Sequence, residues 1–72
     1  MNNPIKEFDV VALTADLPEH GLLQGQVGTV VEVLSNNRVI VEFVDLNGST
    51  YGLATLDSNR LLRLSYEPVA AA

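Results

Sequence analysis

The sequence predicts an all-β protein: one small domain in which five short strands form a barrel. Ten valines and two isoleucines crowd the chain, and β-branched side chains favour strands over helices. Glycine, asparagine, aspartate and serine separate these apolar runs, as tight turns require. A chain of 72 residues buries only about 60% of its unfolded surface. A barrel suits such a small core because it hides most strand edges.

The expected strands are short apolar runs between turn-forming residues: Asp9–Leu13, Val27–Leu34, Arg38–Val44, Thr50–Thr55 and Leu61–Leu64. The third strand alternates most clearly. We expect its core-facing side chains to be Val39, Val41 and Phe43, and its outward-facing ones to be Arg38, Ile40, Glu42 and Val44. The second strand is apolar on both faces. Either a bulge near Gly28 shifts its register, or Val30 and Leu34 pack under the long loop.

The connections between these strands differ in length. Residues 35–37 and 45–48 predict tight hairpins, because asparagine, aspartate and glycine tolerate positive φ. Residues 14–26 are too interrupted by proline and glycine for a helix. Their leucines, Leu17, Leu22 and Leu23, predict that this loop folds back over one end of the barrel. Residues 56–59 predict one helical or 3-10 turn, capped by Asp57 or Ser58.

Together these features predict a small SH3-like barrel with a long first loop and a 3-10 turn before the last strand. The alternative is a five-stranded OB-type barrel, although that fold usually has longer strands and an intervening helix. We expect residues 8–66 to form the barrel. Residues 1–7 and 67–72 are expected to be flexible ends.

The charge balance favours a protein partner over nucleic acid or membrane. Nine acidic residues stand against four basic ones, for a net charge of -5, and the basic residues are scattered: Lys6, Arg38, Arg60 and Arg63. Phosphate backbones need a positive footprint that this chain lacks. The acidity therefore either steers a basic partner or simply keeps the domain soluble. No apolar run approaches membrane-spanning length and no signal peptide is evident, so we expect a cytoplasmic protein.

No residue pattern predicts catalysis, a metal or a cofactor. The chain has no cysteine and one histidine, His20, which is a poor basis for a metal site or a catalytic triad. Asp45, Asn47 and Gly48 lack the spacing and terminal glutamate of a calcium loop. Without tryptophan, the aromatic groove that grips polyproline is also not expected. We therefore expect no enzyme activity, no metal and no cofactor.

Two regions are candidates for binding a protein partner, because exposed aliphatic side chains bordered by acids suit protein interfaces. The long loop contributes Asp16, Glu19, Leu22 and Leu23. The outer sheet face contributes Glu32, Ile40, Glu42 and Val44. Alternatively, the two leucines plug the barrel, and the glutamates belong to an ordinary solvated face. An exposed strand edge also makes a homodimer possible.

The stretch 25–33, followed by 39–43, resembles the glycine-and-valine hairpin of KOW and other SH3-like domains. Many KOW domains bind RNA or ribosomal proteins through basic loops, which are absent here. More widely, Phe8–Leu13, Asp16–Glu19, Gly21-Leu22, the hairpin, Val41–Phe43, Gly48, Tyr51 and Thr55-Leu56 resemble a family of short bacterial and cyanobacterial proteins of unknown function. This resemblance implies a stand-alone SH3-like barrel. Toxin-like partners encoded beside its members suggest an antitoxin or immunity role, with no catalytic residues to transfer.

The expected function is that of a non-catalytic protein-binding module, and the role we expect for it is that of an antitoxin or immunity-type acidic protein that neutralises a basic partner. Two alternatives remain: a KOW-like domain associated with nucleic acid or the ribosome, and an accessory subunit of a larger enzyme.

Overall fold

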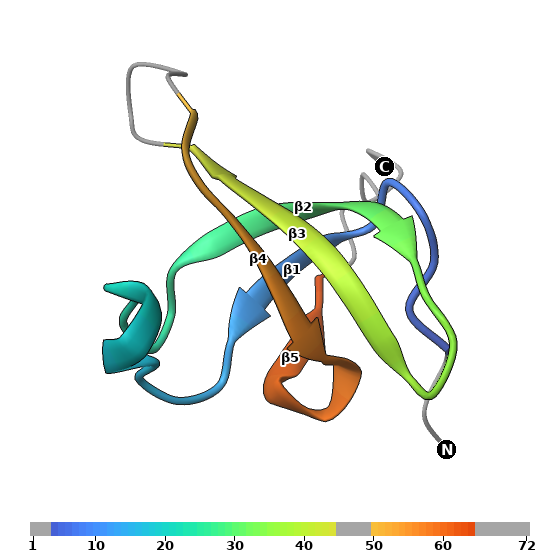
Figure 1. The fold of residues 1–72 in the computed structure, drawn as a ribbon, viewed down its shortest axis with the longest axis horizontal. Coiled ribbons are helices and arrows are strands. Elements are labelled where there is room, and N and C mark those ends of the chain that lie inside the picture. The colour runs from blue at the N-terminus through green and yellow to red at the C-terminus, as the bar shows by residue number, and fades with distance from the viewer. Residues whose placement is uncertain (1–3, 45–49, 65–72) are drawn as a thin grey trace, which may run out of the picture.

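Five antiparallel strands form one sheet in the computed structural model, which describes residues 4–44 and 50–64 (Figure 1). The strands are β1 (Val10–Leu13), β2 (Val27–Val33), β3 (Arg38–Val44), β4 (Thr50–Asp57) and β5 (Leu61–Arg63). Their order in the sheet is β4-β3-β2-β1-β5. Two short 3-10 helices, η1 (Pro18–His20) and η2 (Ser58–Arg60), lie in the connections. The all-β prediction is therefore confirmed.

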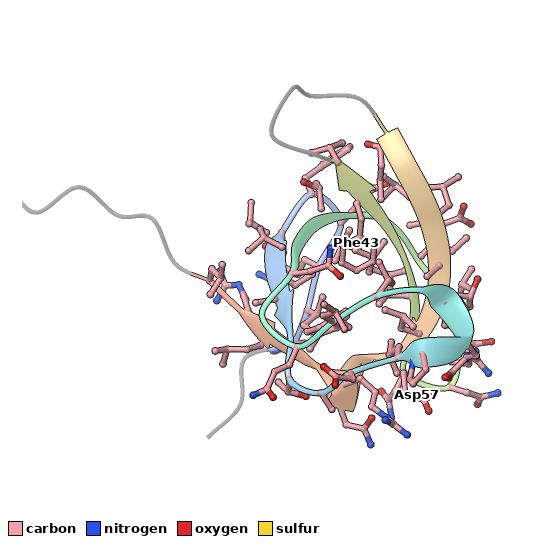
Figure 2. All side chains as sticks on the ribbon, turned by 90° about the vertical axis from the view of Figure 1, so that its left-hand side faces the viewer. Phe43 and Asp57 are labelled. Atoms are coloured by element: carbon pink, nitrogen blue, oxygen red, sulfur yellow. The ribbon has the colours of Figure 1, made fainter. Side chains whose placement is uncertain are left out.

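One face of the curled sheet encloses the core. Figure 2 shows the strands curving around a common interior in which the Phe43 side chain lies. The predicted inward residues of β3, Val39, Val41 and Phe43, are all buried. The other strands and the long loop complete this core with Val11, Leu13, Leu17, Leu22, Val30, Ala54, Leu56 and Leu61.

The ambiguity of the second strand resolves into a bulge. Val30 pairs with Val41, whereas Glu32 pairs with Ile40, so Val31 is an extra residue in β2. The sequence predicted a bulge near Gly28. In the structure the bulge lies three residues further along the strand, at Val31. Before the bulge, Gly28 and Val30 face the core. Because an extra residue interrupts the alternation, apolar side chains occur on both faces of this strand.

The long loop covers one end of the core, as predicted, but with two of its three leucines. Leu17 and Leu22 are buried and bridge each other through backbone hydrogen bonds of 2.8 and 3.1 Å. Between them lies η1, a three-residue helix that the sequence interpretation did not expect, which ends at Gly21 with φ 68°. Leu23 is 62% exposed. Its predicted place over the core is therefore wrong.

The β2–β3 turn confirms its predicted hairpin. Asn36 and Asn37 both have positive φ, 63° and 61°. Two adjacent residues of this kind are typical of a type I′ turn, whose twist matches that of the flanking strands. The second predicted hairpin, residues 45–48, lies outside the described residues.

The turn before the last strand occurs two residues later than predicted. β4 continues to Asp57, and η2 occupies Ser58–Arg60. Asp57 is the N-cap residue, but its side chain makes no capping hydrogen bond. Its carboxylate instead lies 3.8 Å from Arg38 Nε, so the expected cap by Asp57 is wrong.

The two outermost strands of the sheet, β4 and β5, are edge strands within the described residues. Within the described residues β4 pairs only with β3, and β5 only with β1, so hydrogen bonding does not close the sheet into a full cylinder. η2 joins the two edges covalently. Of the expected flexible N-terminus, the described part includes Ile5, which packs against the core. The remaining terminal residues, 1–3 and 65–72, lie outside the described residues.

Phe8 combines a left-handed backbone with an exposed ring. Its φ is 72° and it is 73% exposed. A tight turn holds this geometry: Asp9 N donates to Lys6 O at 3.1 Å, and Asp9 Oδ2 accepts from Lys6 N at 2.8 Å. Phe8 N also donates to Val30 O at 2.7 Å. A bulky residue pays a steric penalty in this region that asparagine largely avoids.

We therefore expect Phe8→Asn to stabilise the domain by about 1 kcal/mol, measured by thermal or urea unfolding. The exposed ring contributes little burial that the change would remove. Phe8→Ala is the matched control, since it removes the ring but keeps the Cβ that causes the penalty, and its effect should be close to zero. A lower stability for Phe8→Asn than for Phe8→Ala would contradict the presence of strain at this residue.

Candidate functional site

The predicted loop residues do not all reach the surface. Asp16 and Glu19 are exposed, as is Leu23. Leu22 is only 3% exposed and belongs to the core, so its predicted role in partner binding is wrong. Asp16 Oδ1 accepts a hydrogen bond from Gln24 N at 2.8 Å, which holds one carboxylate in a defined place on the loop.

The predicted sheet residues share the outer face of the sheet. Ile40, Glu42 and Val44 alternate with the core residues of β3, and Val44 is 42% exposed. Glu32 lies opposite Ile40 at the bulge. Glu42 lies opposite Thr29, so the two glutamates are neighbours on a diagonal rather than a directly opposed pair. This offset lessens the repulsion that directly opposed like charges suffer.

The predicted sheet group extends from the β2–β3 turn to the end of the sheet near the long loop. Glu32 and Ile40 are near the β2–β3 turn. The long loop leads directly into Val27, at the other end of β2, and is tied to the end of β1 by a Gly25 N to Leu13 O bond of 2.8 Å. The pairing of Gly28 with Phe43 places Val44 at this same end. One compact site cannot therefore include all eight predicted residues.

A continuous apolar strip crosses the outer face at the end near the loop. Ala12 of β1 pairs with Val27 of β2 on one side and with Leu62 of β5 on the other. Val44 continues this row onto β3, one residue beyond the Gly28–Phe43 pair. Three of these side chains are well exposed: Val27 43%, Val44 42% and Leu62 58%. We call Ala12, Val27, Val44 and Leu62 the outer strip.

A second row borders the outer strip. It runs across four strands through the successive pairs Val10–Thr29, Thr29–Glu42 and Glu42–Leu53. Val10, Thr29 and Glu42 are half-buried, while Leu53 is 64% exposed. Glu42 thus places a carboxylate beside an otherwise largely apolar surface. Aliphatic side chains with a bordering charge are typical of protein interfaces.

Three members of the outer strip, Ala12, Val27 and Leu62, were not among the residues predicted from sequence. Val27 was assigned to a strand with apolar residues on both faces, and Leu62 to a short edge strand. The sequence does indicate an outward-facing leucine in this strand. Because side chains alternate along a strand, one of the adjacent residues Leu61 and Leu62 must face outward. What the sequence does not reveal is the register that places Leu62 beside Ala12 and Val27.

Half of the basic side chains are already paired with carboxylates. Arg38 Nε lies 3.8 Å from Asp57 Oδ1, with both side chains about half exposed. Arg63 Nε lies 3.1 Å from Asp9 Oδ2, and the Asp9 side chain is only 17% exposed. These pairs reduce the positive charge that the described surface offers to an anion. Exposed carboxylates at Asp16, Glu19 and Glu32 leave that surface predominantly acidic.

Comparison with known families identifies the domain. Residues 7–63 match the family described as Domain of unknown function (DUF4926). The chain belongs to the DUF4926 family. The matched span covers all five strands and both 3-10 helices. No curated protein and no solved structure matches the chain.

The described part of this DUF4926 domain contains no group of three or more histidine, aspartate or glutamate side chains placed to hold a metal ion. His20 lies exposed at the end of η1. The residues considered for a calcium loop, Asp45, Asn47 and Gly48, lie outside the described residues. None of the described helices has the length and apolar character needed to cross a membrane.

Proposed function

We propose that this DUF4926 protein is a non-catalytic, cytoplasmic binding module with an SH3-like barrel, and that it binds a basic protein through the outer strip. An antitoxin or immunity role fits this proposal: the module covers the basic functional surface of a toxin-like protein and so blocks it. The SH3-like interpretation is supported by the long β1–β2 loop, the tight β2–β3 turn and η2 before β5.

The exposed apolar row Ala12–Val27–Leu62, extended by Val44, is the observation that carries the proposal. Three of these side chains are more than two-fifths exposed. Fully burying an aliphatic side chain is worth about 1.5–3 kcal/mol, so each of these half-exposed side chains forgoes roughly half of that free energy. A protein partner that covers the strip recovers that free energy.

Charge complementarity supports a basic partner. The net charge is -5, and Glu42 lies in the row next to the outer strip. Asp16 and Glu19 are exposed on the loop that leads into Val27. Carboxylates at the border of an apolar contact accelerate association with a positively charged protein and discriminate against acidic ones.

A KOW-like nucleic-acid role has less support. Arg38 and Arg63 are each engaged with a carboxylate, and the acidic surface repels phosphate. A role as accessory subunit of a larger enzyme uses the same strip and differs only in the partner. Neighbouring genes distinguish these two roles: a toxin-like gene supports the antitoxin role, and a gene for an enzyme subunit supports the accessory role.

The test begins with the tagged protein expressed in its host, where the co-purifying protein is identified and then produced recombinantly. We expect the double variant Val27→Lys/Leu62→Lys to weaken binding to that protein at least about a hundredfold, equivalent to about 2.8 kcal/mol, because two interface aliphatics become charged. Isothermal titration calorimetry measures the change.

The matched control is Val33→Lys/Phe8→Lys. It adds the same charge at two exposed apolar side chains, 47% and 73% exposed, which lie toward the other end of β2, away from the outer strip. This control should stay within about threefold of the wild-type dissociation constant, since only the long-range charge changes. Equal losses in the two double variants would show that charge, and not the strip, governs binding. Absence of any basic partner would overturn the proposed function.

A further inference from the structure

Within the described residues, no strand pairs with the outer edge of β4. Ser58 N donates to Asn37 O at 2.7 Å, which sets the phase of the β3–β4 hydrogen bonds. Because the residues of an antiparallel strand bond alternately to either side, Ala54 and Leu56 bond to β3. Leu53 and Thr55 consequently direct their N–H and C=O groups away from β3, toward the free edge.

Between Gly52 and Asp57 this edge has no bulge and no proline, which are features that normally prevent strands from pairing with other chains; the register with β3 shifts just before Gly52. Leu53, in the middle of the run, is 64% exposed. Among the described residues, Arg38 Nη2 donates a hydrogen bond of 3.4 Å to Thr55 O, one of the outward-directed carbonyls of this edge. Protected edges carry lysine, proline or a bulge, or are very short.

The opposite edge of the same sheet is protected. β5 has three residues, ends in Arg63 and follows Arg60. Arg63 is held at the edge by its ion pair with Asp9, at 3.1 Å. A short, positively charged edge is a poor template for strand addition. The domain therefore has one open edge and one protected edge.

We propose that two copies of this chain pair antiparallel along their β4 edges and form a dimer with one continuous sheet. A two-fold axis at Ala54 places Leu53 of each copy opposite Thr55 of the other, so that their outward-directed N–H and C=O groups bond reciprocally. The Thr55 C=O, which already accepts from Arg38 Nη2, has a second lone pair for this bond. Ala54 then faces Ala54 of the other copy at a closely spaced, non-hydrogen-bonded position, where small side chains fit. This interaction is separate from the binding of a basic partner.

Topology favours a second copy as the occupant of the β4 edge. In this register the two Asp57 carboxylates lie at opposite ends of the pair, about 20 Å apart at roughly 3.3 Å per residue. That separation exceeds the Debye length of about 8 Å at physiological salt, so their repulsion is screened. Because the β5 edge is protected, pairing uses up the open edge of both copies. The assembly therefore closes as a dimer and does not extend into a fibre.

Sedimentation velocity and light scattering over a wide concentration range test the dimer. We expect the wild-type protein to reach twice the monomer mass. Leu53→Lys should raise the dimer dissociation constant at least about tenfold. Leu23→Lys is the matched control: its leucine is 62% exposed against 64% for Leu53, and it should dimerise like the wild type. A wild-type monomer at all concentrations, growth beyond the dimer, or a dimer unaffected by Leu53→Lys would each overturn the proposal.

Hydrogen exchange of the wild-type protein gives a second measurement that needs no variant. On going from low to high concentration, the amides of Leu53 and Thr55 should become protected at least about tenfold, as they acquire acceptors in the second copy. The amides of Ala54 and Leu56, already bonded to β3, serve as the internal reference. No difference between the two pairs of amides would contradict pairing at this edge, even if a dimer of another kind forms.

Discussion

Phe43→Ala should lower the free energy of unfolding by about 4 kcal/mol, which is between about a third and all of the stability of so small a domain. Phe43 is fully buried and is the largest of the completely buried side chains among the residues whose burial the structure describes. Removing a buried phenylalanine ring typically costs 3–5 kcal/mol, because burial is lost and a cavity remains. Domains of this length have about 4–11 kcal/mol in total. Urea unfolding monitored by circular dichroism measures the effect.

Phe43→Leu is the control for this prediction. It keeps an apolar side chain of nearly the same bulk, and we expect a loss of about 1 kcal/mol with a cooperative transition preserved. If Phe43→Ala behaved no worse than Phe43→Leu, Phe43 would not be the centre of the core.

Gly28→Ala should destabilise the domain by about 3 kcal/mol, although it adds a single methyl group. Gly28 lies opposite Phe43. A Cβ atom there would lie 2.7 Å from Val41 Cγ1, 2.8 Å from Glu42 O and 2.9 Å from Phe43 Cδ1. One of these neighbours is a backbone oxygen in the middle of a paired strand, so relief requires movement of the strand. Overpacking of this kind typically costs 1–3 kcal/mol, and the backbone clash places Gly28 at the upper end.

Gly52→Ala is the matched control, because Gly52 flanks Phe43 from the other neighbouring strand. No heavy atom lies within 4 Å of a Cβ placed there. We expect a change close to zero or a gain of about 0.5 kcal/mol, since alanine loses less backbone entropy on folding. Thermal unfolding of the two variants gives the comparison, and equal destabilisation would contradict the close approach of β2 to Phe43.

Residues that follow a simple alternation were predictable. β3 is regular, so a period of two correctly placed Val39, Val41 and Phe43 in the core. The adjacent asparagines of the β2–β3 turn tolerate positive φ, which made that hairpin predictable as well. Both results depend on local chemistry that a single strand or turn contains.

Features that depend on the pairing of distant segments were not predictable in detail. The bulge at Val31 depends on the register between β2 and β3. The burial of Leu22 and exposure of Leu23 depend on the bridge between Leu17 and Leu22 across η1. Adjacent leucines look alike in the sequence, and only the backbone geometry of the loop decides which one enters the core.

In the candidate site, too, positions set by local alternation were predictable, whereas contacts set by the pairing of distant strands were not. Glu42 and Val44 were expected on the outer face because they alternate with known core positions. The apolar strip beside them joins residues from four strands, and its continuity arises only from the β1–β2 and β1–β5 registers. Sequence therefore identified the face but not the contiguous surface on it.

Backbone amide mapping of the protein in complex with its co-purified partner tests the central claim most directly. The isotope-labelled protein is titrated with the unlabelled partner, and nitrogen–proton correlation spectra follow each amide. We predict that the perturbed amides cluster at Ala12, Val27, Val44 and Leu62. Perturbations confined to the turn at residues 35–37, with the outer strip unchanged, would contradict the claim that this strip is the binding surface.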